Sequence, residues 1–230
     1  KLASQPCPPA FLDVDVMELL LRTLRTVTQM TNESIRKVVE EFFSEDKTFD
    51  SPVAAAKWGR IADWDVSKVV NMSFLFSGCY FFDQDIGGWD VSMVRNMEFM
   101  FQGCPCFNQD LGGWDVGEVE HMSGMFNKCL AFNQDIGRWD VGASRYMKHM
   151  FTGASAFDQD IGGWAVGAVE DMSFMFRGAS AFNQDIKGWD VAEAADTLGM
   201  FDTDRRNPFM ERQKAASMQR TWTQYGTMCD

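Results

Sequence analysis

The sequence predicts an α/β solenoid: a stack of about six 25-residue coils with parallel strands and a helical cap at each end. Two observations predict it. Helix-forming segments flank a central array, and apolar residues inside the array repeat at a constant interval of 25 residues with no insertion or deletion. The interval is set by the tryptophans Trp64, Trp89, Trp114, Trp139, Trp164 and Trp189. Such a period is typical of arrays whose units stack and bind macromolecules along an extended surface.

Further apolar columns follow each tryptophan in the same register. They comprise Met72, Met97, Met122, Met147 and Met172; Leu75, Met100, Met125, Met150, Met175 and Met200; and Phe76, Phe101, Phe126, Phe151, Phe176 and Phe201. With a valine three places before the first column, the spacing approximates one face of a short helix. We therefore expect a short helix in each coil and continuous ladders of these side chains in the core, with methionine as a core filler.

Two other stretches of each copy predict extended chain. Residues 86–91 carry β-branched and aromatic residues in a run too short for a helix. Residues 82–86 are similar, with Asp and Gly marking bends. We expect one parallel strand in each coil, stacked about 4.8 Å from the next.

The ends differ from the array, because an open solenoid needs caps with a polar outer face. Residues 1–10 contain three prolines and predict an extended tail. We expect an N-terminal helical cap over 11–58, the six-repeat solenoid over 59–207 and a C-terminal helical cap over 208–230, in one cooperative unit. The N-terminal cap should hold a helix from about Val14 to Met30 and an amphipathic helix that begins after Thr31 and Asn32.

The repeat itself resembles a known family. The string Phe-Asn-Gln-Asp-Ile-Gly-x-Trp-Asp-Val stands at 132–141 and, with Gly188 before the tryptophan, at 182–191. It resembles the BspA-type surface-protein repeats, the DUF285 or Mycoplasma lipoprotein family, which is grouped with leucine-rich-repeat solenoids. The resemblance runs from Trp58 to Phe201, including the lead-in 58–67. It implies a leucine-rich-repeat-like fold and a non-enzymatic surface or interaction protein.

Charge narrows the classes of partner. The chain holds 33 acidic and 21 basic residues, for a net charge of −12. This balance argues against nucleic acid and anionic lipid and is compatible with a basic protein surface. No apolar run reaches the roughly 18 residues of a transmembrane helix. We expect a secreted or cell-surface protein, or one in an organelle lumen.

The cysteines follow the repeat register. Cys79, Cys104 and Cys129 share a column with Ala154 and Ala179, which indicates a small buried residue and a reduced, inert thiol.

Cys106 shares another column with alanines, namely Ala131, Ala156 and Ala181, and the same interpretation applies to it. Cys7 and Cys229 lie near opposite ends of the chain, so we expect no bridge between them.

No catalytic constellation is present, and we expect no catalytic residue, cofactor or metal. There is no Gly-rich phosphate loop, no GxSxG and no acid pair with a plausible pocket. A zinc site of His121, His149 and Cys129 is the weaker alternative.

Two acidic columns need compensation, because stacked like charges repel. They are Asp65, Asp90, Asp115, Asp140 and Asp190, and Asp85, Asp110, Asp135, Asp160 and Asp185. Calcium between coils is one solution, and Asx turns to the local backbone are the other, favoured because Ala165 interrupts the first column. Gln84, Gln109, Gln134, Gln159 and Gln184 predict an amide ladder.

The candidate partner surface departs from the core pattern. Ten places after the tryptophans stand Phe74, Phe99, Gly124, His149, Phe174 and Gly199. On the expected helix this column faces water, where aromatic rings are typical interface anchors. Tyr80, Phe81, Pro105 and Leu130 extend the apolar character over the first three coils. We predict partner binding by Phe74, Phe99, Tyr80, Phe174 and Leu130; the alternative is that neighbouring coils bury the rings.

The sequence therefore predicts a protein–protein interaction or scaffold module without chemistry of its own. It would act on a cell surface, or as an accessory subunit that stabilises a larger multi-subunit assembly. The alternative function is a calcium-dependent structural or adhesive surface protein.

Overall fold

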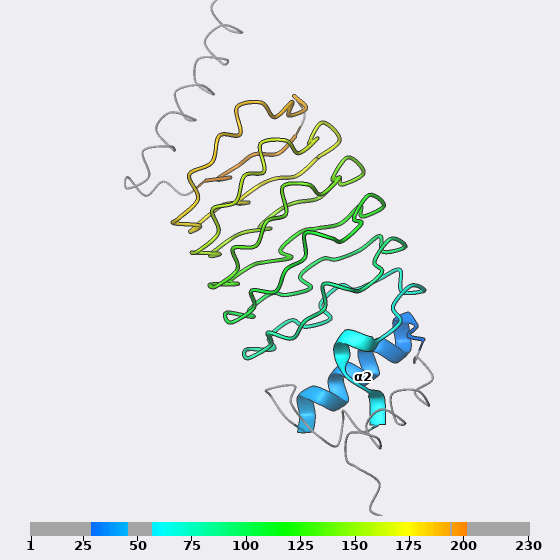
Figure 1. The fold of residues 1–230 in the computed structure, drawn as a ribbon. Coiled ribbons are helices and arrows are strands. Elements are labelled where there is room, and N and C mark those ends of the chain that lie inside the picture. The colour runs from blue at the N-terminus through cyan, green and yellow to red at the C-terminus, as the bar shows by residue number, and fades with distance from the viewer. Residues whose placement is uncertain (1–28, 46–56, 194, 202–230) are drawn as a thin grey trace, which may run out of the picture.

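The computed structural model describes residues 29–45, 57–193 and 195–201. Within these ranges the chain winds into a stack of coils, with helix α2 (Asn32–Glu45) against one end (Figure 1). The short 3-10 helix η1 (Ile61–Asp63) leads into the first tryptophan. Each coil is named here by the tryptophan that opens it. The chain is a repeat solenoid, as the register predicts.

Helix α2 begins where its capping residues predict. The Thr31 hydroxyl accepts a hydrogen bond from the Ser34 amide at 3.2 Å, and the Ser34 hydroxyl accepts one from the Thr31 amide at 2.8 Å. This reciprocal pair satisfies amide groups that the first helical turn leaves open. Before the helix, Gln29 forms a parallel bridge with Asp65, so the predicted extension of an earlier helix to Met30 is wrong at its end.

Neighbouring coils pair through the segment whose spacing predicts a helix. The amide groups of Met72, Phe74 and Phe76 donate to carbonyl groups of the next coil at 2.8, 2.8 and 2.9 Å. Parallel bridges join successive copies of one column: Asn71, Asn96, His121, Tyr146, Asp171 and Asp196. The prediction of a helix here is wrong, because these amide groups bond between coils and not along their own turn.

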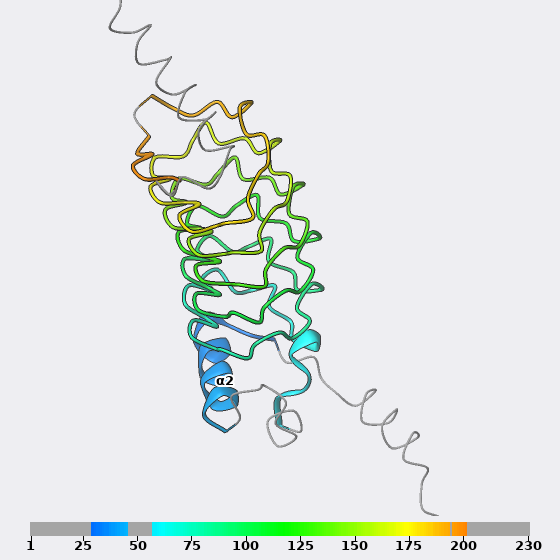
Figure 2. The same ribbon diagram turned by 90° about the vertical axis from the view of Figure 1, so that its left-hand side faces the viewer.

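Consecutive turns produce the three-residue spacing that resembles a helix. The amide of Val69 donates to Val66 at 2.8 Å, and that of Leu75 donates to Met72 at 3.2 Å. The predicted strands are also misplaced. The 86–91 stretch contains a turn closed from Trp89 to Ile86 at 3.1 Å, and no bridge pairs 82–91 within the described ranges. Figure 2 shows the resulting coils edge-on, as a stack of bent loops.

The predicted ladders of tryptophan, valine, methionine and phenylalanine form the core. All six tryptophans of the array are buried, and the Trp89 indole donates to the Ile61 carbonyl of the preceding turn at 2.9 Å. A second phenylalanine row packs on the first, with the rings of Phe76 and Phe82 4.0 Å apart. The indole bond repeats in Trp114, Trp139, Trp164 and Trp189. Buried polar groups of the ladder are thereby satisfied.

The glutamine column bonds to the backbone and does not form the predicted amide ladder. The Gln109 side-chain amide donates to the Asp83 carbonyl at 2.9 Å, and the Asn108 backbone amide donates to the Asp83 carboxylate at 2.9 Å. Later coils repeat this arrangement. Each of these four glutamines, from Gln109 onward, bonds to a carbonyl of the preceding coil, and such a bond satisfies a backbone group that side-chain pairing would leave open.

The aspartate columns close local turns, which confirms the Asx interpretation. The Asp85 carboxylate accepts a hydrogen bond from the Gly87 amide at 3.1 Å, and that of Asp90 accepts one from Ser92 at 3.1 Å. The bonds from Ser92 lower the pKa of Asp90. Equivalent bonds form at Asp65, Asp110, Asp115, Asp135, Asp140, Asp160 and Asp185. Backbone donors therefore compensate part of the repulsion along each column.

Helix α2 supplies the hydrogen bonds that a preceding coil would supply. Inside the stack, the amides of Glu120 and His121 both donate to the Arg95 carbonyl. In the first coil, the amides of Val70 and Asn71 donate instead to the Asn32 side-chain oxygen, at 2.9 and 3.1 Å.

The carbonyl groups of the same edge are also satisfied by α2. The Arg36 guanidinium donates to the carbonyls of Ser73 and Asn71, at 2.7 and 3.4 Å. In later coils, amide groups of the preceding coil fill these positions. Two side chains of one helix thus replace the backbone of an absent coil.

A lysine marks the other end of the glycine column. A Cβ atom at Gly162 would lie 2.7 Å from the backbone carbonyl oxygen of Asp185 in the next coil. One at Gly112 would lie 2.8 Å from the backbone carbonyl oxygen of Asp135, so both positions exclude a side chain. The next residue of this column after Gly162 is Lys187, in the Trp164 coil, and it has a Cβ atom. A further coil of the same geometry would collide with that atom, so the change from glycine to lysine is consistent with the end of the array.

Candidate interaction surface

The candidate surface is a column of six residues that share an unusual backbone conformation. We call it the aromatic column: Phe74, Phe99, Gly124, His149, Phe174 and Gly199. Their φ angles lie between 52° and 62°. Each is the third residue of a turn, such as the one closed from Leu75 to Met72, and a positive φ at that position normally calls for glycine. The backbone here favours glycine in every coil.

Four of the six positions nevertheless carry a ring. A side chain in the left-handed region costs about 1 kcal/mol or more relative to glycine. Stacking offsets part of this cost: the ring centroids of Phe74 and Phe99 lie 5.1 Å apart, and those of His149 and Phe174 lie 5.0 Å apart. Such pairs contribute about 0.5–1.5 kcal/mol each. The rings therefore give folding little net advantage over glycine.

The two glycines of the column make room for the rings. A Cβ atom at Gly124 would overlap the Phe99 ring, and one at Gly199 would lie 2.7 Å from the Phe174 ring. Each stacked pair therefore ends on a glycine of the next coil. From the first coil to the last, the column therefore holds two rings, a glycine, two more rings and a second glycine.

The rings of the column remain accessible. Phe74 is 51% exposed, and Phe99, His149 and Phe174 are half-buried. The expected exposure of Phe74 is confirmed, but its predicted cause, the outer face of a helix, is wrong. The left-handed turn directs these side chains outward. The alternative that neighbouring coils bury the rings holds only in part, since each ring covers one face of its neighbour.

Tyr80 and Leu130 lie at a separate turn of the coil. Tyr80 is 59% and Leu130 is 47% exposed. The Tyr80 ring contacts Phe81 edge-on at 5.5 Å, and no ring contact joins it to Phe74 within the described part. Cys106 at this turn is exposed, so its predicted burial is wrong. Alanine recurs in its column without burial, because the turn points away from the core.

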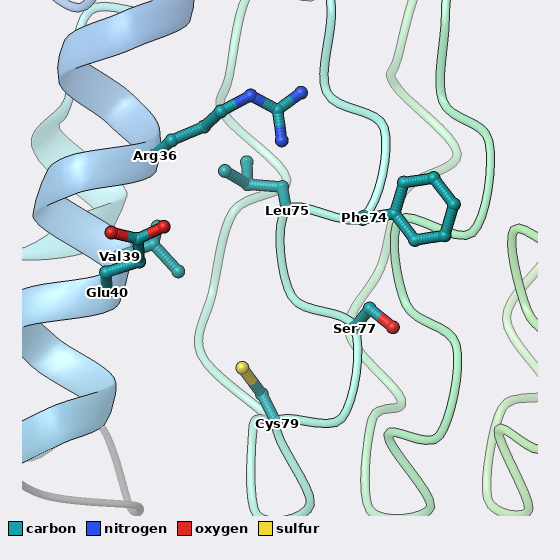
Figure 3. Close-up of a pocket in the computed structure, with 7 residues that line it drawn as sticks. All are labelled: Arg36, Val39, Glu40, Phe74, Leu75, Ser77 and Cys79. Carbon is teal, nitrogen blue, oxygen red and sulfur yellow. The ribbon is translucent and has the colours of Figure 1, made fainter.

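A small pocket separates α2 from the first coil (Figure 3). Its volume is about 170 Å³, and its lining includes Arg36, Glu40, Phe74 and Ser77. In Figure 3 the Phe74 ring points away from α2, toward the later coils. The Arg36 guanidinium, which lines this pocket, is bonded to the edge of the first coil.

Sequence reasoning missed the cations beside the aromatic column. Lys148 precedes His149, and the Arg177 guanidinium lies 5.7 Å from the Phe174 ring centroid. Lys128 has a φ of 60°, whereas its column otherwise holds glycine at Gly78, Gly103, Gly153 and Gly178. The sequence signal was this single lysine in a glycine column, which a search limited to aromatic departures does not find.

The described part of the chain does not bring the suggested zinc ligands together. It contains no group of three or more His, Cys, Asp or Glu side chains suited to a metal ion. The Cys129 thiol is buried and donates to the Phe101 carbonyl at 2.9 Å, and burial raises its pKa. His149 is bonded to Thr152.

Comparison with known proteins identifies the family. The family described as "Mycoplasma protein of unknown function, DUF285" matches residues 25–145 and 112–211. The chain belongs to the DUF285 family. The DUF285 match includes every tryptophan of the array and helix α2.

A solved leucine-rich repeat protein of T. pallidum is similar to this DUF285 chain at 15% identity. The similarity covers 66% of this chain and 77% of that chain, with a TM-score of 0.35. The search of curated proteins found no match to this DUF285 chain. Within the described residues, no helix is long and apolar enough to cross a membrane.

Proposed function

We propose that this protein is a non-enzymatic protein–protein interaction or scaffold module that acts on a cell surface or as an accessory subunit of a larger assembly. Its partner surface is the aromatic column, centred on Phe74 and Phe99 and continued by Phe174. Tyr80 and Leu130 form a margin at the neighbouring turn. The retention of rings where the backbone favours glycine is the observation that carries the proposal, together with the exposure of Phe74.

We also propose the complete architecture around this surface. Residues 1–10 form a tail, 11–58 an N-terminal helical cap, 59–207 a solenoid of six coils and 208–230 a C-terminal helical cap, all in one cooperative unit. The bonds of Asn32 and Arg36 to the first coil support the N-terminal cap. The predicted C-terminal cap, the tail and the cysteines Cys7 and Cys229 lie outside the described residues.

Family membership supports the assignment at the level of a repeat module. Exposed rings on a regular scaffold are typical anchors, and each buried ring contributes about 1.5–3 kcal/mol to association. A calcium-dependent adhesive function is the weaker alternative, because the aspartates already accept backbone hydrogen bonds. A calcium titration followed by the melting temperature separates the two: a large rise would favour the calcium-dependent function.

The experiment is a comparative capture of partners from the native source. The bait is the wild-type chain or a variant carrying Phe74→Gly and Phe99→Gly. Glycine already occupies the equivalent position of the next coil, at Gly124. A partner recovered by the wild type and lost with the variant supports the proposal. Equal recovery by both baits contradicts it. Variant Tyr80→Ser with Leu130→Ser tests the margin separately and should weaken capture less.

A further inference from the structure

Cationic side chains gather around one half of the aromatic column, although the chain carries a net charge of −12. Lys128, Lys148 and Arg177 come from three successive coils. Together with His149 and Phe174 we call them the basic aromatic cluster. The columns of the three cations otherwise hold neutral or acidic residues in the first five coils: Gly78, Gly103, Gly153 and Gly178; Ser73, Glu98, Ser123 and Ser173; and Ser77, Gln102, Asn127 and Thr152.

Hydrogen bonds through Thr152 fix the cluster. The Lys128 amide donates to the Thr152 carbonyl at 2.7 Å, and the Thr152 hydroxyl donates to the Phe174 carbonyl at 2.6 Å. The His149 Nδ1 atom lies 3.1 Å from the same hydroxyl oxygen. The guanidinium of Arg177 lies 5.7 Å from the Phe174 ring centroid, and that ring stacks on His149. Arg177 and the two rings therefore lie together beside Lys148, and the Lys128 backbone is joined to the same coil through Thr152.

The Thr152 hydroxyl also determines the tautomer of His149. Its single proton goes to the Phe174 carbonyl, so the hydroxyl oxygen accepts a hydrogen bond from Nδ1–H of His149. Nε2 of the neutral ring then carries the lone pair. Burial, Lys148 and Arg177 lower the pKa of His149, and Asp171 opposes them. A bound anion would offset these cations and favour a proton on Nε2, which adds a donor toward the anion.

The cations retain hydrogen-bonding capacity for a ligand. Within the described part, Lys128 and Arg177 form no ion pair, and Lys148 meets the Asp171 carboxylate only at 3.9 Å. The described residues contain two buried side-chain oxygen atoms without a hydrogen-bond partner, on Asn127 and Ser173. Each belongs to the chain neighbour of a cluster residue, and buried polar atoms without partners are uncommon in native proteins. Because these two oxygen atoms are enclosed by the protein, the donors available to a ligand are the ammonium groups of Lys128 and Lys148 and the Arg177 guanidinium.

We propose that the basic aromatic cluster binds an acidic peptide segment of the protein partner, with carboxylates held by Lys128, Lys148 and Arg177 and an apolar side chain against the His149–Phe174 rings. This proposal rests on the proposed function. It states which partner chemistry the later coils of the partner surface would recognise. Charge complementarity favours a short acidic peptide. A long polyanion would meet the net negative charge of the whole chain, whereas a peptide with an apolar residue uses both the cations and the rings.

The test uses the full chain and a probe peptide, acetyl-Glu-Glu-Phe-Glu-Glu-amide, with binding measured by isothermal titration calorimetry. A second peptide replaces every glutamate with glutamine. The cluster variant carries Lys128→Gly and Arg177→Gln, which are residues found at these columns in other coils. The control variant, Lys187→Gly, removes a lysine outside the cluster and likewise restores the residue of other coils. The melting temperature of each variant verifies folding.

The wild type and Lys187→Gly should bind the acidic peptide with equal affinity, and the cluster variant should bind it at least about tenfold more weakly. The glutamine peptide should bind weakly to all three. Equal binding of both peptides, or of the acidic peptide to the cluster variant, overturns the proposal. Stronger binding of heparin or inorganic phosphate than of the acidic peptide also overturns it, in favour of a general anion site.

The partner capture separates this proposal from the function on which it rests. If the cluster variant retains the partner that the Phe74→Gly and Phe99→Gly variant loses, the partner surface stands and the acidic-peptide proposal fails. If the ring variant retains the partner while the cluster variant loses it, the acidic-peptide site stands and the centre of the proposed surface is wrong. Loss with both variants supports both proposals.

Discussion

The Phe99 ring lies over Gly124 of the next coil and occupies the place where a Cβ atom would stand. Gly124 itself has a φ of 62°, in the region that side chains rarely adopt. Because the Phe99 ring fills this place, position 124 has no room for a side chain in this arrangement. The Phe99 ring extends toward the next coil, and the column holds glycine at the position that this ring covers.

Gly124→Ala should therefore destabilise the fold, by about 1–3 kcal/mol in the free energy of unfolding measured with urea. Gly113→Ala is the control, because nothing lies within 4 Å of its Cβ position, and it should cost little. In a Phe99→Gly background, Gly124→Ala should lose the steric part of its cost. An equal cost in both backgrounds would show that Phe99 does not cover Gly124.

Asn32→Ala should leave the amides of Val70 and Asn71 without their acceptor, at a cost of about 1–3 kcal/mol in unfolding free energy. Asn32→Asp keeps an oxygen acceptor and should cost less. Glu33→Ala, on the exposed side of the same helical turn, serves as the control. If Asn32→Ala and Glu33→Ala unfold at the same urea concentration, the Asn32 side chain does not stabilise the edge of the stack.

Trp114→Ala should cost about 3–5 kcal/mol, as truncation of a large buried aromatic side chain does. Trp114→Phe retains most of the apolar volume and loses the indole bond to Ile86, so its cost should be smaller. Thermal unfolding measures both. A melting temperature within a degree or two of the wild type for Trp114→Ala would place Trp114 outside the core.

The four described cysteines should differ sharply in reactivity. Burial raises the pKa of the Cys79 thiol to about 12, and it also raises that of Cys104, whereas Cys106 is exposed. Because the thiolate is the reactive form, iodoacetamide at about pH 8 should modify Cys106 in the folded protein and spare the other three. Peptide mass mapping would reveal the sites. Modification of Cys104 at the rate of Cys106 would contradict its burial.

Cys104→Ala should be nearly neutral for stability, since Ala154 and Ala179 occupy the same column. The thiol donates to the Phe76 carbonyl at 3.0 Å, so a small loss is expected from that weak bond. A bridge between any two of Cys79, Cys104 and Cys129, detected by mass analysis without reductant, would contradict the reduced state.

The repeat register predicts which residues are buried but not how the backbone bonds. The ladders of Trp114, Met122 and Phe126 follow from the 25-residue period alone, because equivalent positions stack on one another. The helix prediction failed because turns closed over three residues give nearly the spacing of a helical face. Periodicity records which side chains share a face and does not distinguish bonds within a coil from bonds between coils.

The sequence predicts which aromatic residues form the candidate surface, but it does not predict the backbone conformation that exposes them. The departure from the core pattern identified Phe74 and Phe99. The sequence signal of the left-handed backbone that directs them outward is Gly124 and Gly199, which occupy the same column. The exposure of Cys106 was missed for a related reason. Alanine and cysteine suit a tight exposed turn as well as a buried column, so residue size alone did not settle the environment.

The central claim is that Phe74 and Phe99 serve binding and not folding. Its most direct test is the Phe74→Gly and Phe99→Gly variant, with unfolding free energy and partner affinity measured on the same preparation. The account predicts stability within about 1 kcal/mol of the wild type, because relief of the left-handed strain offsets lost stacking, together with a loss of partner binding of at least tenfold. A variant that unfolds readily, or that binds the partner as the wild type does, would contradict it.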